Sequence, residues 1–246
     1  MFKATISDVS LLRDSIDTIS QIISEGVFKI TKGSISLVAT DRAMVAVVDF
    51  ELKKSAFDEY SCDKETSIGV NIENFLQILK RAKSTDKITL ELEDNKLRIE
   101  MKGEGSRKFS MPLLDISSGE IPEVSQLDFP AEMKLKTSVI EEGINDADII
   151  SDSIVFETDG KVFIMKTEGD LSSMESVIDK NSGLIEISGK EARSRYALEY
   201  LKKMIKAGKI SDVTTLKLGK DFPLKLTFAK PDKVSMSFVL APRVED

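Results

Sequence analysis

The chain has no histidine and no tryptophan among its 246 residues, and it has a single cysteine, Cys62. The lack of histidine excludes Ser-His-Asp and Cys-His catalysis, as well as metal sites built from imidazole. One cysteine can form neither an internal disulfide nor a zinc or iron–sulfur site. Enzyme chemistry would therefore have to rest on paired carboxylates, a lysine or a carboxylate-bound metal.

Long apolar runs are also lacking. No run approaches the roughly 20 residues that a membrane span needs, and residues 1–6 lack the apolar core of a signal peptide. We therefore expect a soluble, intracellular protein with no membrane partner, no metal and no cofactor. The net charge of −7 argues against a protein that coats itself in nucleic acid, but it leaves room for local basic patches.

A pattern of strand, helix, hairpin and further strand occurs four times along the chain. The predicted helices cover residues 8–24, 71–82, 138–150 and 190–207, each with apolar residues at three- and four-residue spacing. The strands that open the four units are expected at residues 2–6, 67–70, 132–136 and 184–187. The predicted fold class is α+β, with two similar domains that each contain a duplicated β-α-β-β-β unit and antiparallel sheets.

The four units pair into two predicted domains, residues 1–116 and 131–246. Between them, residues 117–130 hold two prolines and several acids and have no sustained periodicity, which is typical of an extended surface linker. The pattern alone fits two ordinary α+β domains of no recognisable function equally well.

Several stretches resemble the proliferating cell nuclear antigen (PCNA) family, the sliding clamps of eukaryotes and archaea. They are residues 58–63, 68–71, 78–80, 196–201, 222–224 and the ending 240–246. The resemblance implies a ring of three identical or paralogous subunits, with helices lining the hole and sheets forming the outer wall. It also implies a non-enzymatic processivity factor that encircles duplex DNA without reading its sequence.

The resemblance further implies the clients and the location of the protein. The expected partners are DNA polymerase, the clamp loader, flap endonuclease and DNA ligase. The expected location is the cytoplasm around the nucleoid in an archaeon, or the nucleus in a eukaryote.

A sliding ring should contact phosphates through lysine and arginine on exposed helix faces. The candidates for this DNA-facing role are Arg13, Lys80, Arg81, Lys83, Lys202, Lys206 and Lys209. Each of them singly fits an ordinary solvated charge as well. The third predicted helix carries Glu141, Glu142, Asp146 and Asp148 where the family usually has basic residues, so we expect an unevenly charged lumen. Such a subunit would suit a ring shared with more basic paralogues.

A second candidate surface is a pocket for short peptides from partner enzymes. Strand alternation places Val45 and Val47 outward, where an uncovered apolar surface needs a reason. With the family resemblance, the pocket would comprise Thr40, Val45, Val47, Ile121, Pro122, Pro223, Val239, Ala241 and Pro242. Without the resemblance, ordinary packing under the linker or the tail explains these valines.

A ring also needs two unpaired sheet edges in each subunit. The family pattern places them at residues 106–113 and 170–178, and the candidate interface residues are Lys108, Phe109, Met111, Ser173, Glu175 and Val177. Two other functions stay open at this point. One is a protein-binding scaffold of the same fold that forms no ring, and the other is a carboxylate-metal phosphoesterase or nuclease built on the acidic third helix.

Overall fold

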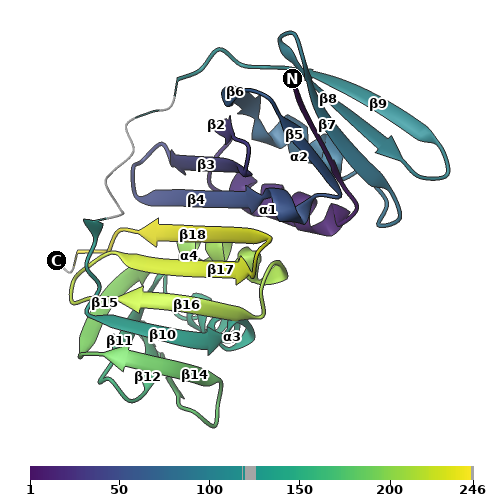
Figure 1. Cartoon of the computed structure of the whole chain (residues 1–246). Helices are drawn as coiled ribbons and strands as arrows, with labels where there is room; N and C mark the ends of the chain where they lie inside the picture. The colour runs from purple at the N-terminus through teal and green to yellow at the C-terminus, as the bar shows by residue number, and fades with distance from the viewer. Residues whose placement is uncertain (118, 120–125, 245–246) are drawn as a thin grey trace. The chain divides into compact units, whose positions relative to one another are not determined.

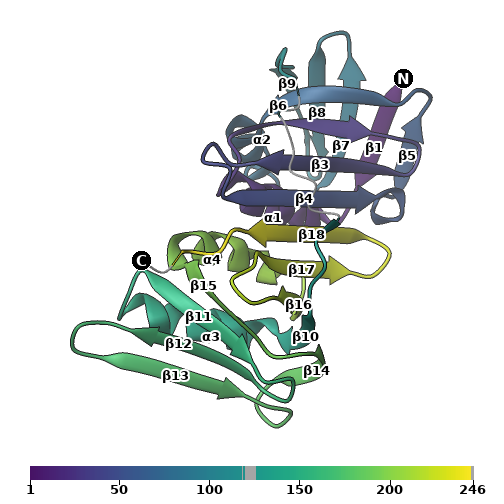
Figure 2. The same cartoon turned by 90° about the vertical axis from the view of Figure 1, so that its left-hand side faces the viewer.

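The computed structural model describes residues 1–117, 119 and 126–244. It separates into two compact units, which mix helices with antiparallel strands (Figures 1 and 2). The first comprises residues 1–41, 48–121 and 230–236, and the second comprises residues 42–47, 122–229 and 237–246. The predicted division into domains at residues 1–116 and 131–246, with a linker over residues 117–130, stays a prediction.

The first half of the chain forms two sheets and two helices. Its strands follow the orders β5-β1-β7-β8-β9 and β6-β2-β3-β4. The elements are β1 (Phe2–Ile6), α1 (Val9–Ser20), β2 (Glu25–Ile30), β3 (Ser34–Thr40), β4 (Ala46–Lys53), η1 (Lys54–Ala56), β5 (Glu59–Cys62), β6 (Thr66–Asn71), α2 (Ile72–Leu79), β7 (Lys87–Glu93), β8 (Lys96–Lys102) and β9 (Ser106–Pro112).

The second half repeats this arrangement. Its strand orders, β14-β10-β16-β17-β18 and β15-β11-β12-β13, match those of the first half strand for strand. The elements are β10 (Ala131–Lys136), α3 (Thr137–Asp148), β11 (Ser153–Thr158), β12 (Phe163–Glu168), β13 (Ser173–Ile178), β14 (Leu184–Gly189), β15 (Ala192–Ala197), α4 (Leu198–Met204), η3 (Ile205–Lys209), β16 (Val213–Leu218), β17 (Leu224–Lys230) and β18 (Val234–Leu240). The predicted α+β class with internal duplication is confirmed.

Side chains at the first turns of α1 and α2 fix where these helices begin. The Asp8 carboxylate accepts a hydrogen bond from the Leu11 amide at 3.1 Å, and the Asn71 side chain accepts one from the Asn74 amide at 2.8 Å. Both bonds satisfy an amide that has no partner within its helix. Ile16 on α1 and Leu76 on α2 are buried, as the apolar spacing predicted.

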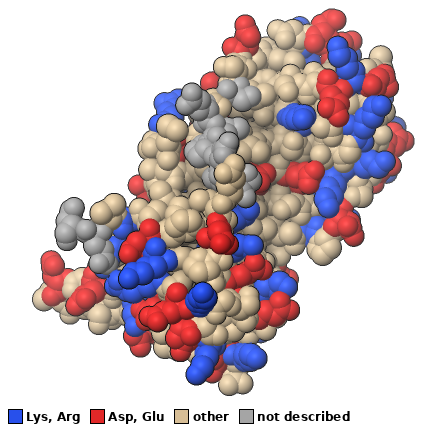
Figure 3. Space-filling view, turned by 60° about the vertical axis from the view of Figure 1, so that its left-hand side comes forward, with Lys and Arg blue, Asp and Glu red and all other residues tan. Residues whose placement is uncertain are grey.

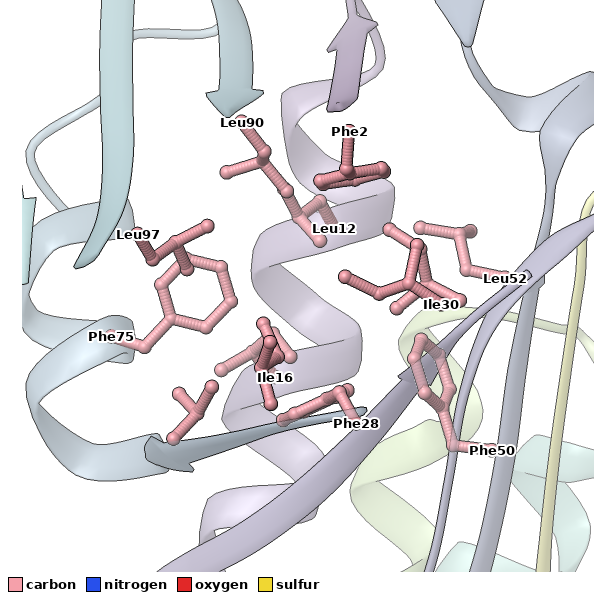
Figure 4. Close-up of a pocket in the computed structure, with 13 residues that line it drawn as sticks. Phe2, Leu12, Ile16, Phe28, Ile30, Phe50, Leu52, Phe75, Leu90 and Leu97 are labelled. Atoms are coloured by element: carbon pink, nitrogen blue, oxygen red, sulfur yellow. The ribbon is translucent and has the colours of Figure 1, made fainter. Parts of the chain in front are cut away.

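The core of the first unit lies where both sheets meet the two helices. Figure 4 shows apolar side chains converging on α1, among them Phe2, Phe28, Phe50 and Phe75. They surround a void of about 30 Å³, which is large enough for a water molecule, but its apolar lining offers such a water no hydrogen-bond partner. The void is a packing defect of the core.

The fourth predicted helix, at residues 190–207, is wrong in its first half. Residues 192–197 form the strand β15 instead, which pairs antiparallel with β11, and α4 begins only at Leu198. Along β15 the buried residues Ala192, Ser194 and Tyr196 alternate with more exposed ones, which is the period of a strand. The last helical segment then changes from α4 to the 3-10 turn η3, which runs to Lys209.

Two further differences follow from the same duplication. The fourth unit opens with β15, whereas residues 184–187 belong to β14, which flanks β10 as β5 flanks β1. The strand β5, within one of the stretches that carry the family resemblance, was not predicted as a strand. The Tyr60 hydroxyl at its centre shares its one hydrogen between the Thr31 and Ser34 carbonyls, at 2.7 and 2.9 Å, and burial raises the pKa of Tyr60 to about 12.

Truncating a side chain at the void should test how tightly this core is packed. Phe50 is 1% exposed, so Phe50→Ala should destabilise the first unit by about 3–5 kcal/mol, as measured by urea unfolding. Val38→Ala on β3, where the side chain is 37% exposed, serves as the control and should change the free energy of unfolding by less than about 0.5–1 kcal/mol. Equal losses in both variants would contradict this account of the core.

Candidate nucleic-acid interface and docking surfaces

The exposed side chains of α1 and α2 form one surface, because an ion pair joins the two helices. The Lys80 ammonium lies 3.5 Å from the Asp17 carboxylate of α1. Arg13 pairs with its neighbour Asp14 at 3.1 Å, so its charge is already compensated. Acids on α1 therefore offset much of the positive charge that the sequence predicted for this surface.

The turn after α2 keeps more of its positive charge. Arg81 is exposed, and its guanidinium forms no ion pair with any described residue. Lys83 pairs with Glu104 at 3.0 Å, but both side chains lie mostly in solvent, where such a pair contributes little. Among the candidates of the first unit, Arg81 and Lys83 are the cations best able to attract an anion.

The helices of the second unit repeat the same bridge between helices. Lys202 of α4 contacts Asp148 of α3 at 2.6 Å, as Lys80 contacts Asp17 in the first unit. Lys206 and Lys209 follow on η3 and are exposed. In both units the cations thus lie on the second helix or just after it, and acids on the first helix partly compensate them.

The acidic character predicted for the third helix is present at the surface of α3. Glu141, Glu142 and Asp146 are exposed, and Asp148 is held by Lys202. In the space-filling view of Figure 3, acidic and basic side chains are interspersed over the face shown. Any anion that meets α3 itself meets a net negative helix.

The strands β9 and β13 are edge strands. Figure 1 shows β9 beside β8, and Figure 2 shows β13 beside β12, and each ends the strand order of its sheet in the described part of the chain. Lys108 on β9 and Glu175 and Val177 on β13 point their side chains to solvent. Both edges stand where the sequence predicted them.

The predicted interface residues differ in how much of them remains accessible. Ser173 is exposed and Phe109 is half-buried, but Met111 is only 4% exposed because its side chain turns into the core under β8. The backbone of Met111 can still pair with another strand, whereas its side chain cannot contact a neighbouring molecule in this conformation.

Two apolar side chains near β13 were missed from the sequence. Ile149, just after α3, is 85% exposed, and Leu171, in the β12–β13 hairpin, is 100% exposed. The hairpin lies close to the end of α3. A side chain added at Gly169 would stand only 2.7 Å from the Ile150 carbonyl oxygen. The exposure of Ile149 could have been predicted from sequence, because this residue falls outside the helix stripe formed by Ile140, Ile144 and Ala147.

The predicted peptide pocket is only partly open. Val47 and Val239 are 6% and 7% exposed, so the expectation of an uncovered surface at Val47 is wrong. Val45, Pro223, Ala241 and Pro242 are half-buried. Thr40 lines a separate hollow of about 120 Å³ in the first unit, together with Val38 and Ile116. The predicted members Ile121 and Pro122 lie outside the described residues.

The C-terminal tail is attached at two points. The Ala241 amide donates to the Val45 carbonyl at 2.9 Å, and the Arg243 amide donates to the Arg195 carbonyl at 2.7 Å. The Arg243 guanidinium also pairs with Asp152 at 2.6 Å, and this hydrogen bond is the main reason why the pKa of Asp152 is below its ordinary value. Arg243 therefore anchors the tail beyond the half-buried Ala241 and Pro242.

No group of three or more Asp, Glu, Cys or His side chains is placed to hold a metal ion within residues 1–117, 119 and 126–244. Of the acids on the third helix, Asp148 is paired with Lys202. No helix in the part of the chain that the structure describes is long and apolar enough to cross a membrane.

Two duplicated halves, each with two antiparallel sheets and a pair of helices, define the DNA-clamp class of folds. Family models for the proliferating cell nuclear antigen match this chain twice, the N-terminal domain at residues 1–117 and the C-terminal domain at residues 121–243. The chain belongs to the PCNA family.

Curated relatives and solved structures agree with this assignment. A DNA polymerase sliding clamp of Methanothermobacter thermautotrophicus is 38% identical, over 100% of this chain and 99% of that protein. PCNA from Thermococcus kodakaraensis matches with a TM-score of 0.93 and 27% identity, over 99% of this chain and 100% of the other. The PCNA2–PCNA3 complex of Sulfolobus tokodaii matches with a TM-score of 0.90 and 30% identity, over 99% and 100%. A. fulgidus PCNA bound to the C-terminal region of FEN-1 matches with a TM-score of 0.90 and 28% identity, over 100% of both chains.

The attachment of the tail should depend on pH in the acid range. Because the folded pKa of Asp152 is lowered by Arg243, the stabilising contribution of this pair is complete above the unfolded pKa and is lost as pH falls through the folded pKa. A carboxyl titration followed by NMR should show that Arg243→Gln raises the pKa of Asp152. The control Lys203→Gln breaks the Glu199 pair and should leave the pKa of Asp152 unchanged, and an unchanged value in Arg243→Gln would contradict the proposed attachment.

Proposed function

We propose that this chain is one subunit of a trimeric DNA sliding clamp, a ring that encircles duplex DNA and holds DNA polymerase and other enzymes on it. The proposal rests above all on the two edge strands, β9 and β13, in a chain of the PCNA family. Relatives named DNA polymerase sliding clamp match the whole chain. A subunit that presents one open edge in each half can join head to tail, and a closing rotation then makes a ring.

The outward residues of the two edges fit each other in charge and in apolar character. β9 presents Lys108 and β13 presents Glu175. When two strands pair antiparallel, as β9 and β13 already do with β8 and β12, residues that face each other lie on the same side of the sheet. Exposed residues of β9 must then face exposed residues of β13, and opposite charges favour Lys108 against Glu175. This register places Ser110 against Ser173 and Phe109 against Met174.

The exposed Ile149 and Leu171 support the same joint. Large apolar side chains that are fully in solvent near an open edge are typical of a surface that a partner covers. On the proposed ring they would lie beside the incoming β9 of the next subunit. The interface would then combine backbone pairing, one charge pair and an apolar margin.

The helix surfaces support a loose and sequence-independent hold on DNA. Arg81, Lys83, Lys206 and Lys209 are exposed cations on the helical surfaces or on the turns that end them, and Lys and Arg contacts to phosphates carry no base information. The neighbouring Lys80 and Lys202 are partly compensated by Asp17 and Asp148, which keeps the total attraction weak. Weak contacts that exchange readily are what a ring needs in order to slide.

The partner surface follows from the half-buried pocket residues and the anchored tail. We propose that short peptides of client enzymes bind beside Val45, Pro223 and Pro242, with the clamp loader, flap endonuclease and DNA ligase as further partners. The structural relative from A. fulgidus carries the C-terminal region of FEN-1. The clamp itself would catalyse nothing and would need no cofactor. Its place would be the cytoplasm around the nucleoid if the protein is archaeal, as its relatives are.

The two further subunits would be identical or paralogous to this chain. The charges give two opposing indications. The acidic α3 would suit more basic neighbours, whereas the Lys108 and Glu175 edges are complementary within one chain. A scaffold that forms no ring would leave both edges without a function. The phosphoesterase alternative has no observation in its favour among the described residues, where no group of three carboxylates is placed to hold a metal ion.

A disulfide test decides both the ring and its register. In a Cys62→Ser background, the pair Ser110→Cys and Ser173→Cys should cross-link on oxidation, because the proposed register brings the two residues opposite each other at about 4.5–5.5 Å between Cα atoms. The product should be a ladder that ends at three subunits, as seen on a non-reducing gel.

The control pair is Ser110→Cys with Glu175→Cys, which corresponds to a register shifted by two residues and should cross-link poorly. A ladder that continues beyond three subunits would argue for an open filament. Preferential cross-linking of the control pair would refute the register, and a monomer under all conditions, alone and with paralogues, would refute the clamp.

The salt dependence of DNA binding should separate free from compensated cations. Each phosphate contact contributes about 0.9 to the slope of log K against log salt, so Arg81→Ala should lower the slope of the assembled ring on linear duplex by at least about 1. Fluorescence anisotropy between low and moderate salt measures it. Lys202→Ala is the matched control and should change the slope less, because Asp148 already compensates Lys202. An equal or larger change in Lys202→Ala would show that this compensation does not matter.

A further inference from the structure

The turn after α2 contains a carboxylate that is almost completely withdrawn from solvent. Asp86 lies just before β7, and its side chain is 3% exposed. One of its oxygens accepts the Lys83 amide at 2.9 Å, and the Asp86 amide in turn donates to the Lys83 carbonyl at 3.1 Å. These bonds close residues 83–86 into a compact turn that follows directly on the exposed Arg81.

The cation that balances this buried carboxylate comes from the edge strand β9. Arg107 forms an ion pair with Asp86 through one terminal nitrogen, and through the other it donates to the Arg81 carbonyl at 2.7 Å. A single guanidinium therefore joins Asp86, at the end of the turn, to the Arg81 backbone that precedes the turn. A planar fork with several fixed donors suits such a double contact better than an ammonium does.

The hairpin between β8 and β9 also closes on Asp86. Gly103 lies so close to the Asp86 carboxylate that a side chain there would collide with it. The Gly103 amide donates to the Gly105 carbonyl at 2.9 Å, which shapes the hairpin that leads into β9. The basic turn, this hairpin and the edge strand therefore meet at one carboxylate.

Successive side chains of β9 lie on opposite faces of the sheet. The Lys108 side chain points to solvent on one face of the sheet, whereas Arg107, on the other face, is directed to Asp86. A carboxylate removed from water must stay paired, so Arg107 cannot leave Asp86 without a large penalty. A shift or loosening of β9 is thereby transmitted to the turn that bears Arg81 and Lys83.

We propose that Asp86 is a positioning residue that couples subunit joining to DNA contact. The inference rests on the proposed clamp function. In a free subunit β9 is paired on one side only, and pairing with the next subunit restrains it on both sides. Through Arg107 and Asp86 this restraint also orders the basic turn, so the ring holds Arg81 and Lys83 in place more firmly than a free subunit does. Because such coupling is reciprocal, phosphate binding at the turn strengthens the joint at β9.

Hydrogen–deuterium exchange of the full chain can test this coupling, at concentrations below and above ring assembly. In the natural sequence, assembly should slow amide exchange both in residues 106–112 and in residues 81–86. The slowing in residues 81–86 should be about fivefold or more, the factor that corresponds to the lower end of usual coupling energies. In Asp86→Asn the strand should still slow on assembly, but the turn should not. The amide side chain keeps an acceptor for Lys83 and removes the charge that holds Arg107.

Glu104→Gln is the matched control. It removes the exposed ion pair with Lys83 but leaves the buried carboxylate intact, so its turn should slow on assembly as in the natural sequence. Arg107→Lys is a second variant, for use if Asp86→Asn does not fold. It keeps a charge near Asp86 but cannot bridge to the Arg81 carbonyl as well, and less than half of the slowing in residues 81–86 should remain.

The possible results are distinguishable. If the turn slows equally in Asp86→Asn, the neighbouring subunit covers it directly and the coupling through Asp86 is refuted. If the turn does not respond to assembly in the natural sequence, or responds fully in Arg107→Lys, the proposal is refuted as well. If size measurements show that the natural chain never assembles, alone or with paralogues, the clamp function itself fails, which is a separate outcome.

Discussion

The unpaired backbone of two strands is the constraint on which the rest of this structure depends. An exposed strand edge invites pairing with any other strand, and proteins commonly block it with bulges, prolines or covering loops. Here β9 and β13 end their sheets with regular ladders to β8 and β12. Two open edges of complementary charge favour the assembly that we propose. The helices, the turn at Asp86 and the tail gain their proposed roles only in an assembly.

The positive charge of the helical surfaces is weak, because nearby acids partly compensate it. A net charge of −7 and acids on α1 and α3 would repel DNA from much of the surface, while the cations after α2 and on α4 and η3 would attract it in the proposed clamp. In each half an ion pair joins the two helices, Lys80 with Asp17 and Lys202 with Asp148. The duplication thus extends from strand order to the placement of charge. A ring that must move along DNA benefits from attraction that no single contact dominates.

Much of the fold could be predicted from sequence because its elements have clear periods. The stripes of α1, α2 and α3 and the strands of the hairpins follow directly from the spacing of apolar residues. The region 190–207 failed because Ala197, Leu201 and Met204 share helical spacing, while the alternation of residues 192–197 carries small and polar residues such as Ser194 whose burial the sequence does not reveal. The buried hydroxyl of Ser194, which donates to the Gly219 carbonyl at 3.0 Å, depends on a contact far along the chain.

The candidate site was predictable in its residue types but not in its pairings. Exposed lysines on helices could be named, yet the compensation of Lys202 by Asp148 depends on how α3 packs against α4. Met111 looked accessible because edge strands are exposed, whereas its side chain lies under β8. Asp86 and Arg107 are 21 positions apart and match no motif, so only the packed structure brings them together.

The anchored tail has one more consequence, which concerns the polarity of its backbone. The amides of Ala241 and Arg243 already donate to carbonyl groups, and Pro242 between them has no N–H. Across these three residues the main chain has no hydrogen to offer. A peptide that lies along this stretch must supply the donors itself, which selects the direction and register in which it can bind before any side chain is read.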